Sequence, residues 1–194
     1  MELLAFFLLY FGLTFVWRSV VVYRKTGINP LVLGKGEDTY GYVGRAFKMT
    51  IMLIAAFVLM RAFWPASIQV LGTIGALQTP TWAVLGWVLM GLSLVIMLVA
   101  QAQMGLSWRI GIDEKNRTGL VTQGLFALSR NPIFLSLRIT LLGLFFYSPN
   151  ALTLALASVG EVLMQLQVRL EEQHLLGQHG EVHATYFQKV RRWI

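Results

Sequence analysis

Two clusters of charged residues lie at matching distances from one turn in the second half of the chain. Arg130-Asn131-Pro132 begins 19 residues before Pro149, and Glu171-Glu172 begins 22 residues after it. Because an α-helix rises about 1.5 Å per residue, two helices joined at Pro149 bring both clusters to one depth. A proline in the first helical turn also leaves the amides near Phe134 and Leu135 free to meet a carboxylate or a phosphate. The spacing predicts a charged pocket, although helix capping alone is also compatible with it.

A second pair of charges has the same symmetry about the turn. Arg138 precedes Pro149 by 11 residues, and Glu161 follows it by 12. Charges inside a bilayer are costly, so each needs a partner or a function. We therefore expect Arg138 and Glu161 to lie at one depth and to interact. A salt bridge that only holds the hairpin together is slightly favoured over an arginine aimed at an anionic substrate group.

Several other chemistries are disfavoured. The chain has no cysteine, which excludes thiolate nucleophiles and cysteine-ligated metals. His179 and His183 are four residues apart, but Gly177 and Gly180 interrupt that segment, so neither they nor His174 are expected to bind metal. We expect His179 to be a polar ligand contact. The glycines are too widely spaced for a phosphate-binding loop, which excludes a Rossmann domain.

The composition indicates the elements that position these residues. Of the 194 residues, 56% are hydrophobic and only 13% are charged, which is typical of an all-α integral membrane protein. We predict one membrane domain, 1–194, with a three-span part at 1–104 and a core at 105–194. The last two spans form a tight hairpin, and the first is a retained anchor rather than a signal peptide. The predicted spans are Leu3–Val22, Phe47–Trp64, Trp82–Gln101, a short Ile133–Tyr147, and Ala151–Leu170.

The basic residues indicate orientation. All of the 16 except Arg61 and Arg138 lie in the first loop, the third loop or the C-terminal segment. The second loop, 65–81, and the hairpin turn carry none, so we expect an outside N-terminus and a cytoplasmic C-terminus. The net charge of +7 is thus attributed to topology and not to nucleic-acid binding. The host membrane is the cell membrane in a prokaryote or the endoplasmic reticulum in a eukaryote. The first loop, about 23–46, is expected to be irregular, and the second a plain connector.

Four motifs together resemble the isoprenylcysteine carboxyl methyltransferase family, in its minimal five-span prokaryotic form. The resemblance covers about Gly105 to Ile194, and it implies a multi-spanning enzyme that uses S-adenosylmethionine and releases S-adenosylhomocysteine. Asn131 stands where many members have histidine, so a proton-handling role at that position is not implied. The motifs are Ser107–Ile112, Leu120–Gly124, Ser129–Phe134, and Glu171-Glu172 through Gly180-Glu181 to Tyr186.

The resemblance also implies a set of cofactor contacts. Acidic side chains suit the ribose hydroxyls and the amino group of S-adenosylmethionine, and a guanidinium or an amide suits its carboxylate. The implied cofactor-binding residues are Val121, Thr122, Gly124, Leu125, Arg130, Asn131, Pro132, Glu171, Glu172 and His179.

For the acceptor, we expect the carboxylate of a prenylcysteine or a similar lipophilic molecule that enters from the bilayer. An α-carboxyl with a pKa near 3.5 is already ionised at neutral pH and needs no general base. The expected catalytic residues are Arg130, Arg138 and Glu172, and the acceptor carboxylate is held by Arg130, Arg138 or Arg109. The alternatives are N-methylation of a phospholipid or other lipid amine, which requires a base, and a non-enzymatic transporter or structural protein. A nicotinamide-dependent reductase is less favoured.

Overall fold

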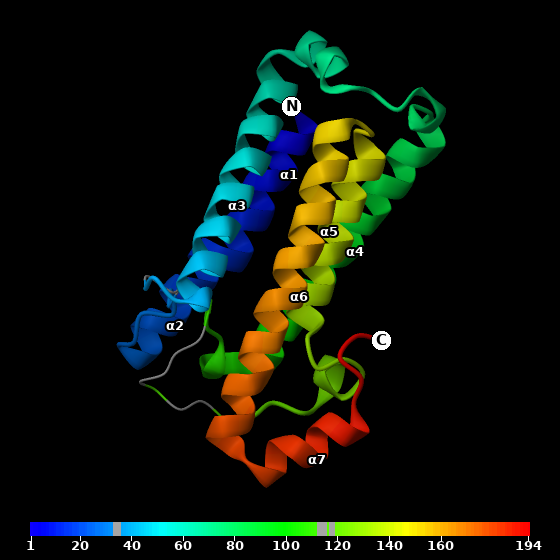
Figure 1. The fold of residues 1–194 in the computed structure, drawn as a ribbon. Helices are drawn as coiled ribbons and strands as arrows, with labels where there is room; N and C mark the ends of the chain where they lie inside the picture. The colour runs from blue at the N-terminus through cyan, green and yellow to red at the C-terminus, as the bar shows by residue number, and fades with distance from the viewer. Residues whose placement is uncertain (33–35, 112–115, 117–118) are drawn as a thin grey trace.

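The computed structural model describes residues 1–32, 36–111, 116 and 119–194, and these form long helices with short 3₁₀ turns between them (Figure 1). The helices are α1 (Glu2–Phe11), the π-helical η1 (Gly12–Trp17), α2 (Arg18–Thr26), α3 (Thr39–Phe63), α4 (Pro80–Met104), α5 (Pro132–Tyr147), α6 (Ala151–His179) and α7 (Glu181–Lys189). The 3₁₀ turns are η2 (Pro65–Leu71), η3 (Gly75–Leu77), η4 (Gly105–Ser107) and η5 (Gly124–Ala127).

The membrane-protein prediction is confirmed. Four helices are long and apolar enough to cross a bilayer: Glu2–Thr26, Thr39–Phe63, Pro80–Ser107 and Ala151–Gln178. The fifth, α5, is apolar but has only 16 residues. At about 1.5 Å per residue it is roughly 24 Å long, less than the ~30 Å hydrocarbon core, which matches the short fourth span expected from the sequence.

Two helices are longer than predicted. α3 begins at Thr39, within the loop that was expected to be irregular, because the Asp38 carboxylate caps it by accepting from the amide of Gly41 at 2.8 Å. α6 continues past Leu170 to His179. It therefore carries the acidic pair Glu171-Glu172 on a regular helix.

The hairpin between α5 and α6 is confirmed. Asn150 and Thr153 form a reciprocal capping box at the start of α6, with bonds of 3.0 and 3.2 Å. The second loop is more than the plain connector that was predicted. The amide of Ile74 donates to Pro149 O, and Gly72 O accepts from the amide of Ala151, both at 3.0 Å. These bonds dock the loop on the hairpin turn.

Helices α4 and α5 pack closely because small residues face each other. A Cβ added at Gly86 would lie 2.7 Å from the carbonyl oxygen of Gly143, which is too close for any side chain. One turn further along, the hydroxyls of Ser93 and Thr140 are 2.8 Å apart, and Thr140 also donates to Tyr10 of α1 at 3.2 Å. These contacts hold α1, α4 and α5 together.

The bundle has two ends. The N-terminus and the α5–α6 turn lie at one end, while α7 and the end of α2 lie at the other (Figure 1). The bundle therefore brings the charged clusters of the sequence to the end opposite the turn, which is called here the α7 end.

Candidate functional site

Glu172 is the centre of the charged cluster at the α7 end. It is 6% exposed, and it receives bonds from three side chains. Arg130 Nε and Nη2 each lie 3.1 Å from Oε1, and Arg192 Nη2 lies 2.6 Å from Oε2. Asn131 Nδ2 is 3.4 Å from Oε1. The predicted meeting of Arg130 and Asn131 with the acidic pair is therefore confirmed for Glu172.

Arg130 directs its remaining donors to the backbone of the C-terminal segment. Its Nη1 donates to Phe187 O at 2.8 Å and to Val190 O at 3.1 Å. The guanidinium also lies 3.8 Å from the centroid of the Phe187 ring, a favourable cation–π contact. With its side chain only 10% exposed, Arg130 anchors α7 to the start of α5.

The last residues of the chain complete this anchor. The amide of Arg130 donates to Arg191 O at 3.0 Å, and Ser129 Oγ and Asn131 Nδ2 donate to Arg192 O at 3.2 and 3.3 Å. Sequence reasoning counted Arg192 only among the basic residues that set orientation. The hydrogen bond to Glu172 raises the pKa of Arg192, against a smaller opposing effect of burial, so the guanidinium stays charged.

The two members of the acidic pair have different partners. Adjacent residues on a helix point about 100° apart, so only Glu172 faces Arg130. The Glu171 carboxylate accepts from the neutral amide of Gln167 at 3.0 Å, and it is half-buried. Glu171 is therefore a carboxylate near the cluster with a neutral hydrogen-bond partner.

One detail predicted at the start of α5 is wrong. Pro132 does occupy the first turn, as expected. The amide of Leu135, however, donates to Asn131 O at 2.9 Å, so it is not free for a ligand. The reason is that the first intrahelical bond of α5 already starts at Asn131.

A cavity of about 510 Å³ lies beside the cluster segment, lined by residues 120–124 and by Gln103 at the end of α4. It includes the predicted cofactor contacts Val121, Thr122 and Gly124. Leu125 lies at its edge, where its amide donates to Gln103 Oε1 at 2.9 Å. Gly124 has φ +63°, and a Cβ there would collide with the Gln103 side chain. Sequence reasoning missed Gln103, which carries no motif.

This cavity passes a simple test for S-adenosylmethionine. Its volume falls within the range of about 300–1,000 Å³ that is usual for small-molecule sites. Its walls are largely backbone with the polar side chains of Thr122, Gln123 and Gln103, which suits ribose hydroxyls and amino groups. The residues present therefore fit the cofactor.

Tyr186 links this cavity to the cluster. Its hydroxyl donates to Phe126 O at 2.6 Å, which ties α7 to η5 between the cavity and Ser129. Burial raises the pKa of Tyr186 to about 12, with a smaller opposing effect from the charge of Arg130. The hydroxyl therefore remains a donor throughout the physiological pH range.

The predicted pair in the middle of the hairpin is confirmed. Arg138 Nε lies 2.6 Å from Glu161 Oε2, and the two side chains are 27% and 38% exposed. Glu161 also accepts from Gln165 at 2.8 Å. The Arg138 guanidinium lies 4.3 Å from the centroid of Trp193, so the C-terminal segment reaches this pair as well.

The remaining candidates lie elsewhere or outside the description. Gly177 lies within α6, and only Gly180, at φ +54°, ends the helix, so the predicted interruption at Gly177 is wrong. The side chain of His179 and the motif residue Ile112 lie outside the described residues. Arg109 Nη1 donates to two carbonyls of its own segment, both at 2.8 Å. Within the described part of the chain, no group of three metal-ligating side chains occurs.

Comparison with known proteins gives one match. Residues 81–181 match the phospholipid methyltransferase family, and this family shares a superfamily with the isoprenylcysteine carboxyl methyltransferases that the motifs resemble. No curated protein and no solved structure matches the chain. The matched region spans α4 to the start of α7 and so includes the cavity and the Glu172 cluster. Because it covers more than half of the chain, this multi-pass membrane protein belongs to the phospholipid methyltransferase family, whose members are methyltransferases that generally use S-adenosylmethionine.

Proposed function

We propose that the protein transfers a methyl group from S-adenosylmethionine to a lipid, with the cofactor in the 510 Å³ cavity at the α7 end. The observation that carries this proposal is the direct run of chain from the cavity wall, 120–124, through η5 to Arg130. When bound, the cofactor supplies an electrophilic methyl group on its sulfonium. Thr122 and Gln103 would bind its polar groups, and the anchor formed by Arg130, Glu172 and Arg192 would hold α7 beside the site.

The roles expected for the other residues follow from their contacts. Arg130, Asn131 and Glu172 bond to one another and to the C-terminal segment, so we assign them a positioning role. Val121, Gly124, Leu125 and Pro132 would shape the site through backbone and apolar contacts. We further propose that 105–194 carries the chemistry and that 1–104 supports it in the membrane.

For the acceptor, the contacts favour a lipid amine over a carboxylate. Arg130 and Arg138, two of the arginines expected to hold a carboxylate, are each ion-paired with a glutamate. Glu171, in contrast, has a neutral partner and can attract an ammonium head group. An ammonium must lose a proton before it attacks the methyl group, and Glu171 is the candidate base. The family match to phospholipid methyltransferases supports the same acceptor.

A prenylcysteine carboxylate is the second candidate. The observation in its favour is the position of Arg138, whose partly exposed guanidinium lies against Trp193 at the edge of the C-terminal segment. An ionised carboxylate needs no base, because proximity, alignment and exclusion of water suffice. No nucleic-acid partner is proposed, and both acceptors would enter from the bilayer.

Cofactor binding tests the site. Isothermal titration of the purified protein with S-adenosylmethionine should give an affinity about tenfold lower for Gly124→Ala, because the new Cβ displaces Gln103 and strains the backbone. Gly177→Ala is the matched control, because nothing lies within 4 Å of its added Cβ. Equal affinity in both variants and the wild type would reject the cavity as the cofactor site.

Turnover against pH tests the acceptor. With phosphatidylethanolamine as acceptor we expect a rate that rises between about pH 6 and 8, because the amine must be deprotonated. Glu171→Gln should lower this rate and leave the cofactor affinity near the wild-type value. Turnover of a prenylcysteine alone, with a flat profile over the same range, would instead assign the carboxylate acceptor.

We also propose that the α7 end faces the cytoplasm and the α5–α6 turn faces outside. The absence of basic residues from the turn and from loop 65–81 supports this orientation. Reporter fusions after Asn150 should be active only outside the cytoplasm. Activity of that fusion in the cytoplasm would reverse the topology.

A further inference from the structure

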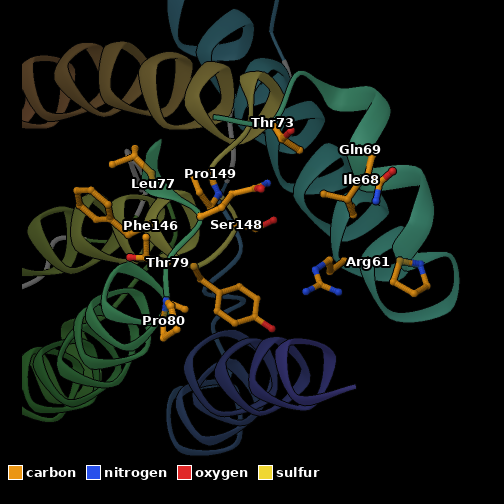
Figure 2. A pocket seen from close by; sticks show the side chains of 14 residues that line it. Arg61, Ile68, Gln69, Thr73, Leu77, Thr79, Pro80, Phe146, Ser148 and Pro149 are labelled. Carbon is orange, nitrogen blue, oxygen red and sulfur yellow. The ribbon is translucent and has the colours of Figure 1, made fainter. Parts of the chain in front are cut away.

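A second cavity lies at the opposite end of the bundle from the proposed methyltransferase site. It has a volume of about 690 Å³, and it is enclosed by the end of α3, turns η2 and η3, the start of α4 and the end of α5 (Figure 2). The whole length of α5, 16 residues or about 24 Å, separates its lining residues Tyr147 and Ser148 from Pro132 at the other site. A molecule bound here cannot reach the methyl donor.

Arg61 is the charged residue among those that line this cavity. Its side chain points into the space between the connector and the hairpin turn (Figure 2). The other lining residues with polar side chains are neutral: Gln69, Thr73, Gln78, Thr79, Tyr147 and Ser148. A wall with one guanidinium, several amide and hydroxyl donors and no carboxylate favours an anion.

Arg61 also differs from the other arginines of the spans. Arg138 pairs with Glu161, and Arg18 donates to the carbonyls of Gln101 and Gly105. For Arg61, the contact within the described residues is a distant one, 6.0 Å from the centroid of the Tyr147 ring. A cation near the end of a membrane helix requires a counter-charge or water at the interface. In a bilayer, the phosphates of lipid head groups lie at that level.

The surroundings of the cavity are suited to a lipid rather than to a soluble anion. Val84 and Val88, on the lipid-facing side of α4 just beyond the cavity residue Ala83, are 62% and 59% exposed. Phe63 and Trp64 at the end of α3 are exposed as well. An acyl chain can lie against either helix while the head group occupies the cavity.

We propose that this cavity, which is called here the Arg61 pocket, binds the phosphate of an anionic lipid from the leaflet at the α5–α6 turn. The lipid holds loop 65–81 against the hairpin turn and is not a substrate. The site is independent of the proposed methyltransferase function, because its ligand and its residues are different.

Native mass spectrometry of the detergent-solubilised protein tests the proposal. The probe is phosphatidylglycerol, with phosphatidylcholine as the zwitterionic comparison. We expect the wild type to retain phosphatidylglycerol, Arg61→Gln to retain about tenfold less, and Arg61→Lys to recover most of the loss, because charge-assisted bonds to phosphate are removed and restored. Arg169→Gln is the matched control, an exposed arginine on α6 outside the pocket, and it should behave as the wild type.

Other outcomes also decide the question. Equal retention of phosphatidylglycerol by Arg61→Gln and the wild type would overturn the Arg61 pocket. Stabilisation of the wild type by inorganic phosphate, lost in Arg61→Gln and without selective lipid retention, would assign a soluble anion and overturn the lipid. If Arg61→Gln does not fold, Gln78→Leu carries the test, because it removes a pocket donor and leaves Arg61 in place. It should lower phosphatidylglycerol retention, and unchanged retention would contradict the proposal.

Discussion

Removal of the Glu172 carboxylate should be the most damaging single change in the anchor of the C-terminal segment. In Glu172→Ala, Arg130 keeps its two carbonyl acceptors and the Phe187 ring, but loses its counter-charge. Its side chain is only 10% exposed, so the cation would be left largely desolvated. Breaking a buried pair in this way costs about 3–5 kcal/mol, and the remaining contacts place the expected loss near the lower value.

The other half of the cluster is worth less. The side chain of Arg192 is 31% exposed, so solvent screens its interaction with Glu172. We expect Arg192→Ala to cost about 1 kcal/mol, the upper value for a surface pair. The double variant Arg130→Met, Glu172→Leu should cost less than the sum of the two single changes, because no unpaired charge remains.

Unfolding in mixed micelles, followed by circular dichroism as the fraction of denaturing detergent rises, measures these losses. Glu181→Ala is the matched control, because Glu181 is exposed in the first turn of α7. The reasoning is refuted if Glu172→Ala and Glu181→Ala lower the free energy of unfolding to the same extent. It is equally refuted if the double variant costs as much as the two single changes together.

Three further predictions use the same unfolding assay. Replacing Arg138 or Glu161 alone by an apolar residue should destabilise the protein more than replacing both, and the opposite order would show that the pair does not interact. Between about pH 10 and 12 the folded state holds the Tyr186 proton that the unfolded state has lost, so the stability of the wild type falls as pH rises there; Tyr186→Phe should lack this part of the fall. Gly86→Ala should cost about 1–3 kcal/mol because its Cβ meets α5 backbone, whereas Gly91→Ala, with open space around the Cβ, should cost nothing.

Counting along the chain was enough to predict the paired depths of the hairpin. Helical rise is nearly constant, so the distances of Arg138 and Glu161 from Pro149 determine their relative height. The same count brought Arg130 to the level of the acidic pair. It could not distinguish Glu171 from Glu172, because a depth count carries no information about the direction in which each side chain points.

The errors arose where a local signal was overlooked or was too weak. Asp38 is a recognisable N-cap, and its position before Thr39 indicated the early start of α3. Gly177 was taken as an interruption, although a single glycine costs a helix only about 1 kcal/mol, which the packing of a long helix overcomes. The docking of loop 65–81 on the hairpin turn left no periodic pattern that could be read.

The sequence by itself determined the membrane class, the hairpin and the depth of each charge, because hydrophobicity, turn residues and helical rise act locally. Only the tertiary structure decided which partners these charges find. Arg192 meets Glu172 across 20 residues and two helix ends, and Gln103 meets Leu125 across a segment without regular structure. The Arg61 pocket likewise forms from three helices and a connector. Contacts of this kind depend on how loops close and side chains pack, and the spacing along one chain does not encode them.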